Sequence, residues 1–351
     1  MQFGEVYNDK PEAPYVLSEF STGMPMDTTL DFGFFNAARR FVSQQGNSAE
    51  LAEFYATDDL YTDHDSNIHA TPTFLGNHDA GRFPHFLQVD TPGIGTDEML
   101  SLTEFAHGLL YLVRGSPVLY YGAEQGMIGT GGWDMRSRES MFASSAPAFR
   151  DAQLLGTDLT GADDKFDPSH PLYQFLAQMG MLRAKHQALR TGAMLVRPTD
   201  SATTFAFSRV ERNDLVEYLA VFNRDRSHPR SLKVPTSRKF SFTAFQIRRM
   251  AQSRKSPSRP KWHGGSYARA TELCVIQGEL SFGPLQGSAT GQADPPSIGL
   301  KTRIRRTRSG WTHISFSSQN RGHSFRKRWR GRSHFHLQPC IPPQPNRAHR
   351  H

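Results

Sequence analysis

The sequence predicts an α/β fold with a parallel sheet, followed by a small all-β domain and a disordered basic tail. Three observations lead to this prediction. Residues 1–192 alternate short apolar runs with longer amphipathic runs, which is the pattern of β/α units around a parallel sheet. In residues 193–236 the apolar residues recur with the period of strands. Residues 237–351 are instead rich in Ser, Arg, Pro, His and Gly, so they offer little apolar surface for a core.

The spacing of apolar residues places the individual elements. Short apolar or aromatic runs predict strands at 3–7, 73–76, 117–122, 204–208 and 217–222. Apolar residues at helical spacing predict helices at 32–42, 47–55, 96–113 and 171–189. Ser48 is the expected N-cap of the second helix. We expect Gly115 to terminate the third helix and Gly192 to close the fourth as a C-cap glycine.

The charge of the chain is divided unevenly along its length. Residues 1–236 contain 19 Lys and Arg and 30 Asp and Glu. Residues 237–351 contain 22 Lys and Arg and three Asp and Glu. The net charges are therefore −11 and +19, and the overall pI of 9.6 reflects the second segment. Basic runs at 301–308 and 326–332, with little apolar surface to bury, predict disorder. The abrupt change of composition favours an out-of-frame translation of the remaining β domain.

Cysteine content and the length of apolar runs bear on the class of protein. Cys274 and Cys340 both lie in the basic tail, so the preceding residues need no disulfide and do not report a redox compartment. We expect no membrane span, because the sequence has no run of about 18 apolar residues. The residues after Met1 include neither a basic n-region nor an apolar h-region, so no secretion signal is predicted.

A carboxylate follows each of two short predicted strands. Glu5 follows the first strand, and Asp79 ends the run Phe74–Asp79. The C-terminal ends of parallel strands in a barrel converge on one mouth. Two carboxyl groups meeting there could hydrolyse a glycoside, since one acid protonates the leaving oxygen while another stabilises the oxocarbenium-like state. Each feature alone has a simpler alternative, a surface loop acid for Glu5 and a polar turn for Phe74–Asp79.

The order and spacing of four segments resemble the α-amylase superfamily of glycoside hydrolases, over about residues 1–236. Its fifth-strand motif is similar to Gly4-Glu5-Val6, and its seventh-strand motif to Phe74–Asp79. Its eighth-strand motif is similar to Gly115–Gln125, and its final barrel helix to Met181–His186. The resemblance implies that residues 1–192 form the C-terminal half, about strands 5–8, of a partial (β/α)8 TIM barrel. Residues 193–236 would begin a truncated β-sandwich-type domain, and residues 237–351 would form the disordered tail.

The resemblance also implies roles for the residues that match these motifs. Glu5 matches the general acid/base, and Asp79 matches the acid that stabilises the transition state. His78 matches a residue that hydrogen-bonds the sugar. These three residues are the expected centre of the site.

Further residues near these motifs are candidates for substrate binding. Asn77 belongs to the seventh-strand motif, and Arg82 could support the catalytic carboxylate or contact sugar, although a plain surface arginine is equally compatible with the sequence. Tyr7 and Trp133 could stack on sugar rings, but core or loop packing is the commoner role of such aromatics. Glu124 fits a structural loop acid better than a catalyst.

One motif of the family does not occur in this sequence. The covalent nucleophile belongs to a fourth-strand motif, Gly-x-Arg-x-Asp, which should precede Glu5, and neither Asp31 nor Asp134 stands in the right place to replace it. Strands one to four and most of the usual calcium-binding region are therefore missing from this chain, so no metal site is predicted and calcium is a candidate only for the full-length parent. We expect open strand edges and no activity from this polypeptide.

The partner expected from the resemblance is an α-glucan or oligosaccharide, with no membrane and no defined protein partner. These motifs are shared by several activities: amylase, α-glucosidase, branching-type transferase, and isomaltulose- or trehalose-forming enzymes. The loop 126–150 is the one specificity element that remains in this sequence. An extracellular or periplasmic parent fits the family. As an alternative, Arg303, Arg305, Arg306, Arg308 and Trp311 could bind polyanions, though no specific nucleic acid is expected. A metal site at His334, His336 and Cys340 lacks any supporting spacing.

Overall fold

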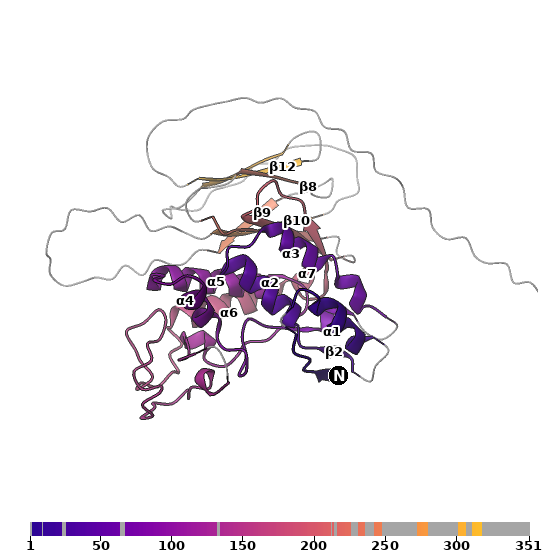
Figure 1. The fold of residues 1–351 in the computed structure, drawn as a ribbon. Helices are drawn as coiled ribbons and strands as arrows, with labels where there is room; N and C mark the ends of the chain where they lie inside the picture. Colours follow the sequence, from indigo (N-terminus) through magenta and orange to yellow (C-terminus); the bar gives the residue numbers. More distant parts are fainter. Residues whose placement is uncertain are drawn as a thin grey trace, which may run out of the picture. The chain divides into compact units, whose positions relative to one another are not determined.

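The structure changes architecture near residue 192, from α/β to antiparallel β (Figure 1). The computed structural model describes residues 2–8, 10–22, 26–63, 67–131, 134–211, 213 and 216–225, together with strands at 231–235, 242–247, 272–279, 301–306 and 311–317. Trp133, one of the candidate aromatics, lies outside the described residues. None of the helices in this described part has the length and apolar character that a bilayer crossing demands.

Four short strands form two parallel pairs in chain order. β1 (Phe3–Gly4) pairs with β2 (Thr28–Thr29), and β3 (Pro72–Thr73) pairs with β4 (Ser116–Pro117). The two pairs are joined, because the Asp31 amide donates to the Pro72 carbonyl at 3.0 Å. Each strand pairs over two residues only, so the predicted strands at 3–7, 73–76 and 117–122 are too long.

Helices separate the strands, as the alternating pattern predicts. They are α1 (Ala13–Ser21), α2 (Phe32–Val42), α3 (Ser48–Tyr55), α4 (Phe83–Asp90), α5 (Thr96–Leu112), α6 (Pro171–Lys185) and α7 (Gln187–Thr191). Short 3₁₀ turns lie at Asp58–Tyr61, Ile68–Ala70, Ala123–Gln125 and Asp134–Ser137. The predicted bounds of α2 are confirmed. The predicted helix 171–189 is divided, because the extended backbone of His186 (φ −117°, ψ 107°) separates α6 from α7.

Three predicted helix ends need correction. Asn47, not Ser48, is the N-cap of α3, since its side chain accepts from the Ala49 amide and completes a capping box with Glu50. Gly192 is extended, with φ −67° and ψ 146°, and is therefore not a left-handed C-cap. The C-cap of α5 is Val113, which lies before the predicted terminator Gly115.

The core forms around α5, which is buried along most of its length and contacts α2, α4 and α6 (Figure 1). A second apolar cluster lies near β2 and β3, where Phe32 packs edge-on against Phe74 at 5.1 Å between ring centroids. Phe35 stacks on the same Phe74 ring at 5.5 Å. Phe74 directly follows β3, so the cluster packs against the start of the segment that leads to Asp79.

The second part of the chain forms two antiparallel sheets. β5 (Ala193–Arg197), β6 (Thr204–Glu211) and β7 (Val216–Asn223) begin a five-stranded sheet of order β5-β6-β7-β10-β9. β8 (Ser231–Pro235) lies at one edge of a three-stranded sheet of order β11-β12-β8. Phe205 of β6 stacks on Tyr55 of α3 at 5.7 Å, so apolar contacts join this sheet to the helical layer.

Four strands lie in the segment that the sequence predicts to be disordered. They are β9 (Phe242–Ile247), β10 (Glu272–Glu279), β11 (Lys301–Arg306) and β12 (Trp311–Ser317). Here β10 pairs with β7 from Glu272 opposite Asn223 to Glu279 opposite Val216, and the disorder expected for the tail as a whole stays a prediction. β10 thus lies along the edge of β7 that would otherwise be open. The remaining residues of the tail lie outside the described part.

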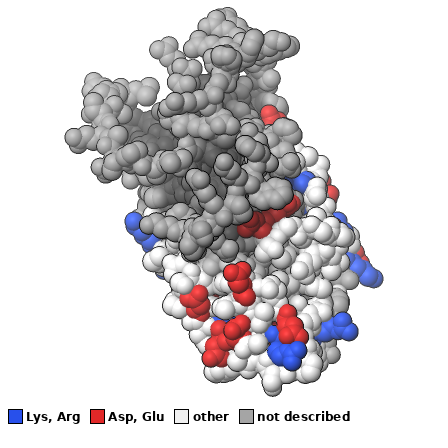
Figure 2. Space-filling view, turned by 90° about the vertical axis from the view of Figure 1, so that its left-hand side faces the viewer, with Lys and Arg blue, Asp and Glu red and all other residues white. Residues whose placement is uncertain are grey.

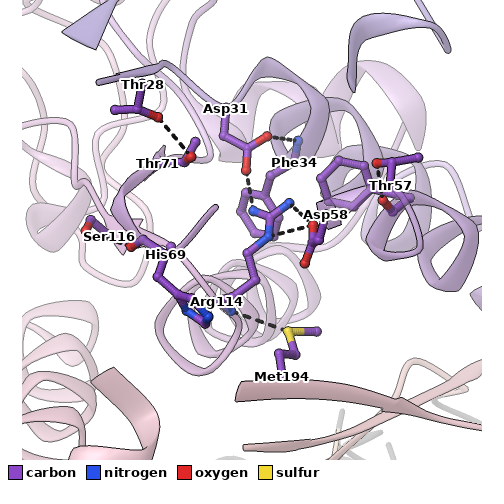
Figure 3. A network of polar contacts seen from close by, with 12 residues as sticks. Thr28, Asp31, Phe34, Thr57, Asp58, His69, Thr71, Arg114, Ser116 and Met194 are labelled. Carbon is purple, nitrogen blue, oxygen red and sulfur yellow. Dashed lines mark hydrogen bonds and ion pairs between the residues drawn. The ribbon is translucent and has the colours of Figure 1, made fainter. Parts of the chain in front are cut away.

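A largely buried ion network joins the segments after β2 and before β4 to the 3₁₀ turn Asp58–Tyr61 (Figure 3). The Arg114 guanidinium pairs with Asp31 through Nη1 and with Asp58 through Nη2, the latter at 2.8 Å, and Arg114 is 1 % exposed. Asp31 also accepts from the Phe34 amide at 2.8 Å and so caps α2. Burial raises the pKa of Asp58 even though Arg114 opposes the shift. These charges compensate one another and lie beneath the surface, which fits a structural role.

Candidate functional site

The candidate site begins with a tight turn after β3. Asn77 and Gly81 exchange two backbone hydrogen bonds of 3.1 Å, and Gly81 takes a positive φ of 104°. The side-chain oxygen of Asn77 accepts from the amides of Asp79, at 3.0 Å, and Ala80. The turn therefore presents His78 and Asp79 at its tip. For Asn77, predicted to bind substrate, the structure gives a local role as the residue that closes the turn.

The Asp79 carboxylate is contacted on both oxygens. His78 Nε2 lies 3.1 Å from Oδ2, and Arg138 Nη2 lies 2.6 Å from Oδ1. The side chains of His78 and Asp79 remain 52 % and 45 % exposed, so both can still be reached from solvent. The turn thus combines a carboxylate, an imidazole and a guanidinium at an accessible position, and these are groups that can hydrogen-bond sugar hydroxyls.

The loop that follows β4 folds back over the turn. The Ser137 hydroxyl donates to the His78 carbonyl at 3.0 Å, and Arg138 Nε donates to the same oxygen at 3.3 Å. Glu139 accepts from the Gly129 amide at 2.8 Å, which anchors this part of the loop to its own start. The loop therefore holds the turn through its backbone as well as through the Asp79 carboxylate.

Arg82 lies beneath the turn rather than at the surface. It is 3 % exposed, and its Nε donates to Glu139 Oε2 at 2.5 Å. Nη1 donates to the Tyr121 carbonyl at 2.7 Å, and the guanidinium lies 4.5 Å from the centroid of the Tyr120 ring. The alternative interpretation of Arg82 as a plain surface arginine is thus wrong. The buried pair with Glu139 also directs the guanidinium into the protein, where it anchors the loop instead of supporting Asp79 directly.

Glu5 and Tyr7 lie beyond the end of β1. Glu5 is exposed, and no described residue makes a hydrogen bond or an ion pair with it. The Tyr7 ring packs edge-on against Phe32 at 5.2 Å, and Phe32 in turn contacts Phe74. Glu5 follows β1 and Asp79 lies in the turn after β3, and each of these strands belongs to a parallel pair. The aromatic chain from Tyr7 to Phe74 links the two segments.

The loop after β4 owes its shape partly to a buried lysine. The Lys165 ammonium donates to the carbonyls of Phe142, Gly161 and Asp163 at 3.1, 3.0 and 2.7 Å. Burial lowers the pKa of Lys165, and the neighbouring acids oppose that shift. Three carbonyls converging on one cation hold two distant stretches of the loop together. This cross-link supports the segment that carries Arg138 and Glu139.

Sequence reasoning missed Arg138 and Glu139. Their contacts join residues 57 to 59 positions apart, and no periodic pattern reports such pairing. The only available signal is their position in a loop after the last strand of a predicted barrel, where loops build the site. Among the described residues, no group of three or more His, Cys, Asp or Glu side chains gathers as a metal site would require.

The basic tail residues considered as an alternative site are only partly described. Arg303, Arg305 and Arg306 lie on β11, and Trp311 begins β12. Arg308, His334, His336 and Cys340 lie outside the described residues. On the face drawn in Figure 2, the described surface carries separated acidic and basic groups rather than a continuous basic patch.

Gly76 offers a test of the turn. A Cβ at this position would lie 2.3 Å from the Gly81 carbonyl oxygen, which is backbone and cannot move aside cheaply. We expect Gly76→Ala to lower the free energy of unfolding by about 1–3 kcal/mol through overpacking, measured by urea denaturation. Gly180→Ala in α6 is the matched control, because nothing lies within 4 Å of its added Cβ. An equal loss in both variants would contradict the close approach.

The chain was compared with known proteins. It is 41% identical over 230 residues to an α-amylase of Streptomyces lividans, which covers 65% of this chain and 24% of the relative. It is 30% identical over 156 residues to a cyclomaltodextrin glucanotransferase of Paenibacillus macerans, covering 44% of this chain and 20% of the relative. The chain therefore spans about a quarter or less of the length of these curated relatives.

A solved structure supports the same fold. The α-amylase of Geobacillus thermoleovorans, complexed with acarbose, aligns with a TM-score of 0.53 at 18% identity, over 79% of this chain and 53% of that chain. The family model for the α-amylase catalytic domain matches residues 1–192, which is more than half of the chain. The likeness of fold and the family match agree with the run of parallel strands and intervening helices described above. The chain belongs to the α-amylase catalytic-domain family.

Proposed function

We propose that this chain is the C-terminal part of a glycoside hydrolase that cleaves α-glucosidic bonds in starch-like or maltooligosaccharide substrates. The observation that carries the proposal is the pair of carboxylates, Glu5 and Asp79, that follow parallel strands of an α-amylase-type domain. The amylase relative from Streptomyces supports the substrate class. β1 to β4 would correspond to the fifth to eighth strands of a (β/α)8 barrel.

Each site residue would have a separate role in the reaction, set by its position. Glu5, exposed after β1, would donate a proton to the leaving oxygen and later accept one from water. Asp79 would bind sugar hydroxyls and stabilise the positive charge that develops on the ring. His78 would donate to the same hydroxyls, and its 3.1 Å contact with Asp79 supports a shared role. Arg138 would hold Asp79 in place rather than meet the reacting atoms.

The retaining mechanism of this family needs one further carboxylate. It forms a covalent glycosyl-enzyme intermediate on an Asp of a Gly-x-Arg-x-Asp motif, and this sequence does not contain that motif. Asp31, the acid after β2, is 1 % exposed and pairs with Arg114, so it cannot take the place of the nucleophile. The full-length parent would supply the nucleophile from the segment that precedes Glu5.

We therefore expect the chain as it stands to release no reducing sugar from starch or maltoheptaose above a blank. The physical reason is the missing covalent step, whose loss costs orders of magnitude in rate. The measurement is a reducing-end assay on the purified chain, with Glu5→Gln and Asp79→Asn variants assayed in parallel. Turnover by the chain that both variants abolish would contradict the predicted inactivity. Turnover that survives both variants would contradict the assignment of the site.

A further inference from the structure

A small cavity lies beside the base of the turn, between α4, α5 and the residues after β4. Its volume is about 20 Å³, and most of the lining is apolar, including Leu75, Leu110 and Met127. A cavity needs roughly 10–15 Å³ to hold one water molecule. The pocket is partly open, and the space within it that a water molecule can reach is about that of a single water.

Arg82 brings an unused donor to this cavity. It lines the cavity, and its Nη2 is buried without a hydrogen-bond partner among the described residues. The other two nitrogens of the guanidinium are engaged by Glu139 and the Tyr121 carbonyl. A buried donor without an acceptor is destabilising, so an acceptor is expected at Nη2.

His107 of α5 brings an acceptor to the same cavity. Its Nδ1 lies 2.8 Å from the Thr103 carbonyl, and a carbonyl can only accept, so Nδ1 carries the proton. Burial lowers the pKa of His107 to about 4, which keeps the ring neutral at neutral pH. Nε2 then has a lone pair, and it makes no hydrogen bond to a described residue.

Thr103 supplies a third polar group. It lines the cavity, and its hydroxyl donates to the Met99 carbonyl at 2.8 Å. With its proton used in that way, the Thr103 oxygen keeps lone pairs that can accept a further hydrogen bond. The residues that line the cavity thus offer one free donor and two acceptors.

We propose that this cavity binds one structural water, which accepts from Arg82 Nη2 and donates to His107 Nε2 and Thr103 Oγ1. Three hydrogen bonds are typical of a buried water. The ligand is neutral, because Glu139 already balances the charge of Arg82 and an anion would bring a second negative charge beside it. The water connects α5 to the base of the turn that carries His78 and Asp79, whatever reaction that turn serves.

A crystal structure of the full chain, refined with ordered solvent, tests the site directly. We expect one water within about 2.7–3.2 Å of Arg82 Nη2 and His107 Nε2. A second crystal soaked in sodium bromide should give no anomalous peak at this position. An absent water in the wild-type chain, or a bromide ion beside Arg82, would overturn the proposal.

Two variants separate the acceptor from the bulk of the side chain. His107→Gln keeps an oxygen that can accept from the water, so the water should remain and Tm should change little. His107→Leu removes the acceptor while filling the space, so the water should be lost and Tm should fall by about 2–4 °C. A water that keeps full occupancy in the Leu variant would contradict the assigned donor and acceptor. If the Leu variant fails to fold, the wild-type and Gln crystals still decide.

Discussion

Arg114→Met is expected to lower the free energy of unfolding by about 3–5 kcal/mol, since removing one member of a buried ion network leaves the others uncompensated. Asp31 is 1 % exposed and Asp58 is largely covered, and both pair with this guanidinium (Figure 3). Methionine fills a similar space without a charge, so most of the loss would arise from the two carboxylates. Urea denaturation followed by circular dichroism measures the change.

Two further variants identify the cause of that loss. Arg150→Met is the control, because Arg150 is exposed and, among the described residues, pairs only with its neighbour Asp151 at 2.9 Å. It should change stability by less than about 0.5 kcal/mol. Adding Asp31→Asn and Asp58→Asn to Arg114→Met removes the uncompensated charges, while the side-chain oxygen that remains at position 31 can still accept from the Phe34 amide. The triple variant should recover most of the loss. No recovery would assign the effect to packing against the Phe54 and Tyr55 rings instead.

The helices of this chain could be predicted from the sequence because their apolar residues recur at short, regular spacing. The bounds of α2 follow from the spacing of Phe34, Ala38 and Phe41, which are all buried. The strands were harder, since each of the four parallel strands pairs over two residues and leaves the rest of its apolar run in irregular backbone. An apolar run predicts burial, but it does not say how many of its residues meet a partner strand.

Contacts between distant residues explain the larger differences. The strand β10 forms against β7, about fifty residues earlier, and composition alone favoured disorder for that segment. The sequence leaves Arg82 open between a site residue and a surface arginine, whereas the structure buries it in a pair with Glu139. The ion pair of Asp79 depends likewise on Arg138, which the loop after β4 brings to the turn. Motif spacing predicts His78 and Asp79 as site residues, whereas the groups that contact them could be identified only from the three-dimensional structure.

Stability is expected to fall by about 3 kcal/mol between pH 6.5 and pH 4 through His107 alone. The pKa of this fully buried imidazole is lowered by burial from 6.5 to about 4. Above pH 6.5 the folded and unfolded states both hold His107 neutral. Below pH 6.5 His107 binds a proton in the unfolded chain but stays neutral in the folded chain. The free energy of unfolding therefore decreases until the pH reaches the pKa of His107 in the folded state.

The difference between the wild-type chain and His107→Gln isolates this contribution. Burial also lowers the pKa of His69, His85 and His170, which adds to the acid sensitivity of both proteins. The raised pKa of Asp58 acts in the opposite direction, because the folded state then binds a proton more readily than the unfolded state. These contributions cancel in the comparison, so urea denaturation at several pH values should show a slope smaller by one proton in the Gln variant. Equal slopes would mean that His107 is protonated inside the folded protein. Its Nε2 would then be a donor, as Arg82 Nη2 is, and the arrangement of hydrogen bonds inferred for the water would fail with it.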